Sequence, residues 1–469
     1  MSNCIVKMGT FHKDPQGALL IEGQFETPRK LWEPRFDNGY PNVIYDPQAK
    51  LYRLYYTLFV KDDHSLNTTP EARKKGPYVI KGRKTGLAYA ESKDGIHWTK
   101  PNLGLVEFEG SKDNNLILRD VQGTGVLYDA KERDPSRRYK LITLQEIKGK
   151  ANLCVAFSAD GIHFSELQVW PQESKSPVPG GDCHNSVFID PRTNEYVLIT
   201  RLWDNNIRVS AISRSKDFYH WTPPKELHRG RGFFDQVYSM PVFQYEGIYL
   251  GLASIFRDGD NSLKQQDNVD LELHWTTTLD RFIPCAPDDD STFIPHGSEG
   301  KGYPDGEFDS NVIFSALPLE QDNKLVFYYM GGKGKHTGWR ETALGRGYIE
   351  KDKFAYYTAR DPAKPCVITT QGLNFPQKKV RLLLELNAGE SCQVALLDRN
   401  GKVQQEGFEA DKSVLSKSAD GWYELSWQNA PYDKLDSSKF YALQITLNGG
   451  KLWAIADAYP RPLKYTRHI

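Results

Sequence analysis

The sequence predicts an all-β protein, with a five-bladed β-propeller followed by a C-terminal β-sandwich. Three observations lead to this prediction. The 469 residues include 25 Tyr, 22 Phe, 38 Gly and 27 Pro, a composition typical of short strands joined by tight turns. A motif of alternating residues, a turn and an aromatic residue recurs along the chain, and a second hairpin pattern precedes each copy. Beyond residue 366 this repeat stops, and other alternating runs follow.

The repeated motif is clearest in residues 92–98, SKDGIHW, and in residues 158–164, SADGIHF. A looser copy, SKDFYHW, spans residues 215–221, and weaker copies follow at 278–282 and 351–354. Each copy comes after a run with period-two alternation. Such a run ending in a turn and an aromatic residue predicts a β-hairpin.

A second hairpin is predicted before each copy, at residues 42–56, 125–142, 186–199, 241–252 and 311–329. Two hairpins per repeat give four strands, and four-stranded sheets repeated radially are the blades of a propeller. Radial closure also protects sheet edges that a linear array would expose. The alternative is a set of unrelated hairpins in a sandwich, but five copies of a two-part pattern favour the propeller.

The predicted domains are an N-terminal segment, 1–29, that packs on or closes the propeller; the propeller, 30–360; and a β-sandwich, 366–469. The sandwich is predicted from strand patterns such as those at 380–386 and 440–447. A polar, basic insertion at 60–84 interrupts the first blade. A loop of that length in a compact domain is expected to be functional or mobile.

Charge and hydropathy exclude several classes of protein. Lys+Arg and Asp+Glu are both 60, so the formal net charge is zero, which argues against a nucleic-acid binder or a protein attracted to anionic membranes. No apolar stretch approaches ~18 residues, so no membrane span is expected. Residues 1–7 lack the pattern of a signal peptide. We expect a periplasmic or extracellular protein if such a peptide was removed, and a cytoplasmic one otherwise; the oligomeric state stays open.

The six cysteines are scattered and contain no C-x-x-C pair, so a structural zinc site is not expected. We expect free, buried thiols. No phosphate loop or dinucleotide fingerprint is present, so no organic cofactor is required. A structural calcium ion in the channel is compatible with the sequence but is not required by it.

Acidic residues precede the first strand of each predicted blade at similar distances. They are Asp37, Asp120, Asp182, Asp235 and Glu307. If the first strands line the channel, these carboxylates gather at one mouth, where mutual repulsion raises the pKa of one of them. A carboxylic acid paired with a carboxylate is what cleavage of a glycosidic bond needs. The alternative for each is a structural role, such as shaping the Asp-Asn-Gly turn at residues 37–39.

Aromatic residues in the flanking loops could stack on sugar faces. They are Trp32, Tyr40, Trp203, Tyr238 and Trp339. The other candidate substrate-binding residues are Arg119, His184, Asn185 and Asp235. For His184, the alternative is a purely structural role. The aspartates of the repeated turns, Asp94 and Asp160 among them, are expected to bond backbone N–H groups of their own turns.

Residues 30–360 resemble the five-bladed propeller glycoside hydrolases of the invertase, levansucrase and arabinanase group. The stretch 36–39 is similar to the loop that carries their nucleophilic aspartate, 119–120 to their Arg-Asp pair, and 182–183 to their Glu-Cys, with aspartate in place of glutamate. The resemblance implies that Asp37 is the nucleophile, Asp120 stabilises the transition state and Asp182 is the acid/base. The stretch 92–118 resembles a bacterial invertase-like branch.

We therefore predict a glycoside hydrolase that acts on an oligo- or polysaccharide, with Asp37, Asp120, Asp182 and Glu307 as candidate catalytic residues. One alternative is a phosphorylase on the same fold, which needs a basic phosphate site. Its candidate residues are Arg119, Arg201, Arg208 and Arg257. The other is a propeller that binds carbohydrate without catalysis. The sugar, the linkage, exo or endo action and the stereochemistry are left open.

Overall fold

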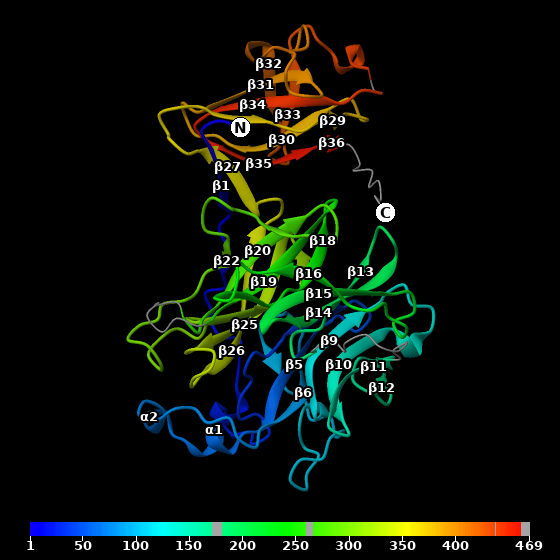
Figure 1. Cartoon of the computed structure of the whole chain (residues 1–469), viewed down its shortest axis with the longest axis vertical. Helices are drawn as coiled ribbons and strands as arrows, with labels where there is room; N and C mark the ends of the chain where they lie inside the picture. Colours follow the sequence, from blue (N-terminus) through cyan, green and yellow to red (C-terminus); the bar gives the residue numbers. More distant parts are fainter. Residues whose placement is uncertain (171–180, 259–265, 437, 461–469) are drawn as a thin grey trace. The chain divides into compact units, whose positions relative to one another are not determined.

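The computed structural model describes residues 1–170, 181–258, 266–436 and 438–460 (Figure 1). Strands dominate, and the helices α1 (Asp63–Asn67) and α2 (Pro70–Arg73) are short, so the predicted all-β class is confirmed. The described part of the chain contains no helix with the length and apolar character needed to cross a membrane. The chain divides into two compact units. Unit 1 contains residues 1–10, 285–291 and 349–469; unit 2 contains residues 11–284 and 292–348.

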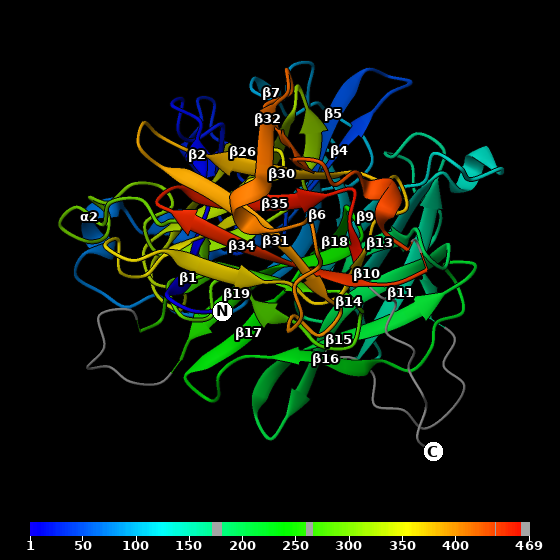
Figure 2. The same cartoon turned by 90° about the horizontal axis from the view of Figure 1, so that it is seen from above.

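Unit 2 begins with three antiparallel sheets made of consecutive strands (Figure 2). The first contains β4 (Asn42–Asp46), β5 (Leu51–Lys61), β6 (Lys84–Ser92) and β7 (Trp98–Thr99), with β8 (Leu116–Arg119) also paired to β6. The second contains β9 (Val121–Tyr128), β10 (Tyr139–Ile147), β11 (Lys150–Ser158) and β12 (Gln168–Val169). The third contains β13 (Ser186–Asp190), β14 (Glu195–Asp204), β15 (Ile207–Ser215) and β16 (Lys225–Arg229).

The remaining strands of unit 2 form two antiparallel groups. One contains β17 (Asp235–Ser239), β18 (Val242–Tyr245), β19 (Ile248–Arg257), β20 (Val269–Thr276), β21 (Ile283–Pro284) and β22 (Thr292–Ile294). The other contains β23 (Val312–Ser315), β24 (Leu319–Gln321), β25 (Lys324–Lys333), β26 (Glu341–Glu350), β2 (His12–Lys13) and β3 (Leu20–Ile21). A single parallel bridge, Val269 to Val312, joins the two groups. The N-terminal strands β2 and β3 therefore complete the sheet that ends with β26.

Apolar side chains fill the space between neighbouring sheets. Strand β5 is buried on both faces: Leu54 and Tyr56 share one core with Tyr328 of β25, whereas Tyr55 shares another with Leu141 of β10. Since side chains alternate along a strand, one apolar run serves two cores. Further cores lie between the second and third sheets and between the third sheet and the β17–β20 group.

The starts of the first strands are joined by side-chain amides. Asn42 Nδ2 donates to the Thr124 carbonyl at 2.9 Å, and Asn185 Nδ2 donates to the Gly123 carbonyl at 2.6 Å. Gly123 has φ +63°, and a Cβ there would lie 1.9 Å from the Cys183 carbonyl oxygen, so only glycine fits this close approach. These contacts fix the loops that carry the candidate site residues.

The repeated Asp-Gly motifs form tight turns, as predicted. Asp94 Oδ1 accepts the N–H groups of Ile96 and His97, both at 2.8 Å, and Asp160 accepts the equivalent pair at 2.9 Å. The hydrogen bonds from His97 hold the pKa of Asp94 well below its ordinary value. The predicted structural role of Asp94 and Asp160 in their own turns is confirmed.

Unit 1 contains two sheets around one core. One sheet contains β1 (Cys4–Met8), β27 (Ala355–Ala359), β35 (Lys451–Ala456), β30 (Val380–Glu385), β33 (Tyr423–Trp427) and β32 (Ser413–Lys417). The other contains β28 (Cys366–Thr369), β34 (Tyr441–Asn448), β29 (Leu373–Asn374), β36 (Tyr459–Pro460) and β31 (Ser391–Asp398). Leu382 and Trp427 of the first sheet pack with Ile445 of the second. The predicted segment 1–29 is divided between the units, and residues 349–360 lie in unit 1.

The expectation of free thiols is wrong for two cysteines. Cys4 and Cys366 form a disulfide between β1 and β28, two strands of unit 1 that are far apart in the sequence. Cys154, Cys183, Cys285 and Cys392 are free. A sequence separation of 362 residues leaves no local pattern from which this pairing could be recognised.

Candidate functional site

Asp37 lies in a strained loop just before β4. The residues Asp37, Gly39 and Tyr40 have φ angles of +56°, +67° and +39°, so the chain turns sharply through left-handed conformations. Such values cost energy in non-glycine residues and cluster at functional sites. The loop is held by Thr342 of β26, whose hydroxyl donates to the Asp37 carbonyl at 2.8 Å.

Two arginines keep the Asp37 side chain ionised. Arg340 Nη2 lies 2.5 Å from Asp37 Oδ1, and Arg35 Nε donates to the same oxygen at 3.3 Å. Burial by itself raises the pKa of this carboxyl, but the guanidiniums of Arg340 and Arg35 outweigh burial and hold the pKa well below its ordinary value. The side chain is still 24% exposed, so it is an anion that a ligand can reach.

Asp182 lies in the loop before β13 and belongs to the same neighbourhood. Arg201 Nη1 donates to Asp182 Oδ1 at 2.8 Å, and the carboxyl is 41% exposed. The Tyr40 hydroxyl donates to the Asp182 carbonyl at 3.3 Å. The loop of Asp37 and the loop of Asp182 are therefore joined by a direct contact.

Asn38 connects the rest of this group. Its Oδ1 accepts from Arg340 at 2.9 Å, and its Nδ2 donates to the hydroxyls of Tyr40 and Tyr238 at 2.8 and 3.4 Å. The Tyr238 carbonyl in turn accepts from Arg201 at 2.6 Å. We call Asp37, Asn38, Tyr40, Asp182, Arg201, Tyr238 and Arg340 the Asp37–Asp182 cluster. It contains four of the predicted catalytic and substrate-binding residues, together with Arg201, which was predicted for a phosphate site.

Cations and aromatic rings alternate beside this cluster. The Arg201 guanidinium lies 4.2 Å from the Tyr238 ring centroid, and Arg208 lies 4.7 Å from that of Trp203. Trp203 is 47% exposed, so much of its side chain is open to solvent. His336 packs against Tyr238 with ring centroids 5.0 Å apart. The exposed indole of Trp203, with the Arg208 guanidinium beside it, is a suitable surface on which a sugar ring could stack.

Within the residues that the structure describes, neither Asp120 nor Glu307 makes a hydrogen bond or ion pair with the cluster. Asp120 is exposed, with φ +55°, and its N–H donates to the Thr85 carbonyl at 2.8 Å. Arg119 points to another loop and donates to the Glu107 carbonyl at 3.0 Å. Glu307 Oε2 accepts from the Ser298 N–H at 2.9 Å. The catalytic roles of Asp120 and Glu307 stay predictions.

The histidine and amide beside Asp182 lie inside the protein. Burial lowers the pKa of His184 to about 3, and its Nε2 lies 3.2 Å from Asn42 Oδ1. Asn185 donates to two backbone carbonyls and accepts from the Thr200 hydroxyl at 2.7 Å. His184 Nε2 and the Asn185 amide thus hold neighbouring loops in place, whereas His184 Nδ1 is buried without a hydrogen-bond partner. Their predicted contact with substrate stays a prediction.

The other two predicted tryptophans, Trp32 and Trp339, have different surroundings. Trp32 Nε1 donates to Asn115 Oδ1 at 2.7 Å beside the core of the first sheet. Trp339 is next to Arg340 and packs on Tyr78 of the 60–84 insertion, with ring centroids 5.1 Å apart. Tyr78 also lies 4.0 Å from the Arg35 guanidinium. The insertion therefore contacts the arginine that pairs with Asp37.

Sequence reasoning missed Arg35, Arg340 and His336. Arg35 could have been noticed because it lies two residues before Asp37. Arg340 lies about 300 residues from its partner, and no local pattern distinguishes it from other arginines of the chain. Within the described residues, no group of three His, Cys, Asp or Glu side chains is placed to hold a metal ion. The calcium site stays a prediction.

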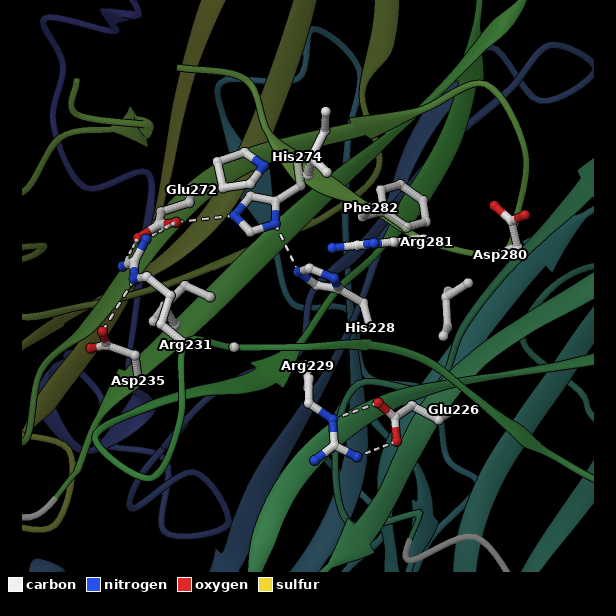
Figure 3. A pocket seen from close by; sticks show the side chains of 15 residues that line it. Glu226, His228, Arg229, Arg231, Asp235, Glu272, His274, Asp280, Arg281 and Phe282 are labelled. Carbon is white, nitrogen blue, oxygen red and sulfur yellow. Dashed lines mark hydrogen bonds and ion pairs between the residues drawn. The ribbon is translucent and has the colours of Figure 1, made fainter. Parts of the chain in front are cut away.

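A cavity of about 540 Å³ lies elsewhere in unit 2, lined by residues of β16, β20 and the 280–284 loop (Figure 3). In its wall, Glu272, His274 and His228 form a hydrogen-bonded chain with contacts of 3.0 and 2.9 Å. Asp235 belongs here and pairs with Arg257 at 2.6 Å and Arg231 at 3.2 Å.

The neighbour of Asp235 points the other way. Gln236 Oε1 accepts from Arg208 at 2.9 Å, so the period of two along β17 turns Asp235 away from the Asp37–Asp182 cluster. Glu272 in the cavity wall is engaged by Arg231, Arg257 and His274 and is almost fully buried. The exposed carboxylate Glu226 and the part-exposed Asp235 in the lining are themselves paired with arginines: Glu226 with Arg229, and Asp235 with Arg231 and Arg257.

Comparison with known proteins finds similarity among solved structures. No protein-family model matches the chain, and no curated protein matches it. A glycosyl hydrolase from Bacteroides ovatus is similar with a TM-score of 0.47 at 15% identity, over 74% of this chain and 95% of that one. A structure from the GH130 family of mannoside phosphorylases, described as containing glycoside hydrolases that target β-1,2 mannosidic linkages in Candida mannan, gives 0.44 at 15% identity, over 72% and 94%. The β-1,2-mannobiose phosphorylase of Listeria innocua gives 0.45 at 12% identity, over 73% and 97%.

Proposed function

We propose that unit 2 is a five-bladed β-propeller and that unit 1 is a β-sandwich. The two cores of β5 support the ring, because the first sheet packs against the second sheet on one face and against β25 on the other. A closed ring brings the starts of the first strands to one end of a central channel. The amide contacts of Asn42 and Asn185 between neighbouring first strands fit this arrangement.

The proposed activity is cleavage of a glycosidic bond in an oligo- or polysaccharide. One observation carries it: Asp37 is an accessible anion held by two buried arginines, in one cluster with the accessible carboxyl of Asp182. Asp37 is assigned as nucleophile or base, and Asp182 as the acid that protonates the leaving oxygen. This division of roles is also that of the invertase-like enzymes that the sequence resembles.

The other predicted acids take secondary places in this proposal. Asp120 is proposed to orient and tune the reacting pair, since it is exposed and directly precedes β9, the first strand of the second sheet. Glu307 is tied to the Ser298 N–H, so the acid role is assigned to Asp182. Trp203 is proposed to carry a sugar ring on its exposed face, with Arg208 behind it.

The test starts with a screen of glycan hydrolysis to find a substrate. On that substrate, Asp37→Asn and Asp182→Asn should each lower kcat by about 10²–10⁴-fold while binding is kept. Asp433→Asn is the matched control, because Asp433 is an exposed, ion-paired aspartate of unit 1. Wild-type kcat in Asp37→Asn contradicts the assignment of Asp37. Binding without turnover by the wild-type protein, across the panel, indicates a non-catalytic carbohydrate-binding protein.

Phosphorolysis is a second candidate, because donors near Asp37 are unused. Arg35 Nη1, Arg340 Nε and Nη1, and Arg208 Nε are buried and have no hydrogen-bond partner. Unpaired guanidinium N–H groups are suited to an oxyanion such as phosphate.

Of the arginines predicted for this role, Arg201 and Arg208 lie at the cluster, whereas Arg257 pairs with three carboxylates elsewhere. Release of a sugar phosphate only when inorganic phosphate is present supports phosphorolysis; equal turnover without phosphate excludes it.

A further inference from the structure

Glu22 is a buried carboxylate directly behind the Asp37–Arg340 pair. It follows β3 in the N-terminal segment and is 1% exposed. Its Oε1 accepts two backbone N–H groups, from Phe36 at 2.9 Å and from Thr342 at 3.2 Å. One oxygen thus joins the loop before β4 to the strand β26, two segments that lie about 300 residues apart in the sequence.

The two segments that Glu22 joins are those that carry the paired groups. Phe36 is bonded to Asp37, and Thr342 lies two residues beyond Arg340. Thr342 also holds the Asp37 carbonyl through its hydroxyl at 2.8 Å. The position of the Asp37 carboxylate relative to the Arg340 guanidinium, 2.5 Å away, therefore depends on how Glu22 holds both backbones.

We propose that Glu22 is a positioning residue for the Asp37–Arg340 pair, and this inference rests on the proposed glycosidase function. Substrate does not reach Glu22, because the side chain is fully buried. It acts by fixing two backbone segments whose side chains meet at the site. A displacement of about 1 Å at a reacting group can cost about 100-fold in rate, so a buried brace of this kind controls turnover.

The contacts of Glu22 fit the ionised carboxylate. Three groups donate hydrogen bonds to it: Phe36 N–H, Thr342 N–H and Gln24 Nε2, the last at 3.0 Å. Burial nevertheless raises the pKa of Glu22 to about 7, against these bonds and the charge of Arg35.

The other charged groups around Glu22 come from three neighbouring elements. Glu341 of β26 pairs with Lys333 at 3.2 Å. Arg73 of α2 donates to Gln24 at 3.0 Å, and Glu33 lies beside Gly23. Glu22 therefore changes its charge near neutral pH while these neighbouring groups stay in place. Within our proposal, this change of charge affects the position of the Asp37–Arg340 pair.

The first arm of the test needs no substrate. Crystal structures of Glu22→Ala and Glu22→Gln at neutral pH are compared with that of the wild-type protein. In Glu22→Ala the contact between Arg340 Nη2 and Asp37 Oδ1 should open, and in Glu22→Gln, whose amide oxygen still accepts the two N–H groups, it should stay closed. An unchanged contact in Glu22→Ala overturns the inference. The result of this structural comparison does not depend on whether the protein cleaves a glycoside.

The second arm uses a substrate that the wild-type protein cleaves. Glu22→Ala should lower kcat about 10- to 100-fold with little change in KM, and Glu22→Gln, which keeps the acceptor oxygen but not the charge, should restore part of it. Asp309→Ala is the matched control: Asp309 is equally buried, accepts from Lys13 at 2.6 Å and Tyr329 at 2.8 Å, and should lower stability while kcat is kept. Equal kcat losses in Glu22→Ala and Asp309→Ala overturn the inference.

Where Glu22→Ala does not fold, Glu22→Gln carries the kinetic test. The dependence of kcat on pH should lose its inflection near 7 in this variant, because the group that titrates there has been removed. Persistence of the same inflection overturns the inference. Absence of any turnover in the wild-type protein contradicts the proposed function instead, and leaves the structural arm to decide the role of Glu22.

Discussion

Asp37 and Glu22 show how one small region gives two carboxylates opposite properties. Glu22 is fully buried and Asp37 is partly buried, and burial raises the pKa of each. Around Asp37 the charges of Arg340 and Arg35 outweigh burial, so its pKa falls. Around Glu22 the partners are neutral N–H groups and one more distant arginine, so its pKa rises to about 7.

This difference predicts how stability depends on pH. The pKa of Glu22 rises on folding from 4.5 to about 7, so ionising it in the folded protein costs stability. The cost is absent below pH 4.5, grows as pH rises, and reaches about 3 kcal/mol above pH 7. Urea unfolding should therefore show Glu22→Gln gaining stability relative to the wild-type protein between pH 5 and pH 8.

Asp37 supplies a comparison of opposite sign. Its pKa is lowered on folding, so its contribution is present above its ordinary pKa and is lost as pH falls below that value. The free energy of unfolding of Asp37→Asn relative to the wild-type protein should consequently be the same at pH 5 and at pH 8. A stability difference between Glu22→Gln and wild type that stays constant across this range contradicts the raised pKa of Glu22.

At the scale of elements, the sequence was informative wherever the signal is local. The turn motifs at Asp94 and Asp160 need only a few consecutive residues, and the structure confirms them. The paired hairpins likewise appear as antiparallel strands in their predicted order. Asp235 was predicted at the site because it precedes the first strand at a distance similar to that of the other acids. A shift of one residue along β17 moves a side chain to the other face of the strand, so this distance alone does not decide where Asp235 points. Arg340 and the Cys4–Cys366 disulfide depend on contacts across most of the chain, which no local pattern records.

The turn aspartates give a prediction for a single element. Asp160 Oδ1 accepts the N–H groups of Ile162 and His163, so Asp160→Ala leaves two donors of the turn without their acceptor. We expect the free energy of unfolding to fall by about 1–2 kcal/mol in urea. Asp160→Asn keeps an acceptor oxygen and should lose less. Equal stability of the alanine variant and the wild-type protein shows that water replaces these bonds without cost.

At the scale of the whole molecule, the chain builds two units with separate cores. All residues of the Asp37–Asp182 cluster, together with Glu22 and the 60–84 insertion, belong to unit 2. Unit 1 has its own core between two sheets and carries the Cys4–Cys366 disulfide. Units with separate cores could in principle fold alone. The chemistry proposed for unit 2 therefore does not require the disulfide of unit 1.

This division predicts two transitions in differential scanning calorimetry. Cys4→Ser removes the covalent link between β1 and β28, and a disulfide of this kind contributes typically about 2–4 kcal/mol. The variant should therefore lower the melting temperature of unit 1 and leave that of unit 2 in place, whereas Asp160→Ala should do the reverse. In reducing buffer, the wild-type protein and Cys4→Ser should melt alike, since both then lack the link. A single transition that both variants shift equally, or alkylation of Cys4 in the unreduced folded protein, contradicts this account.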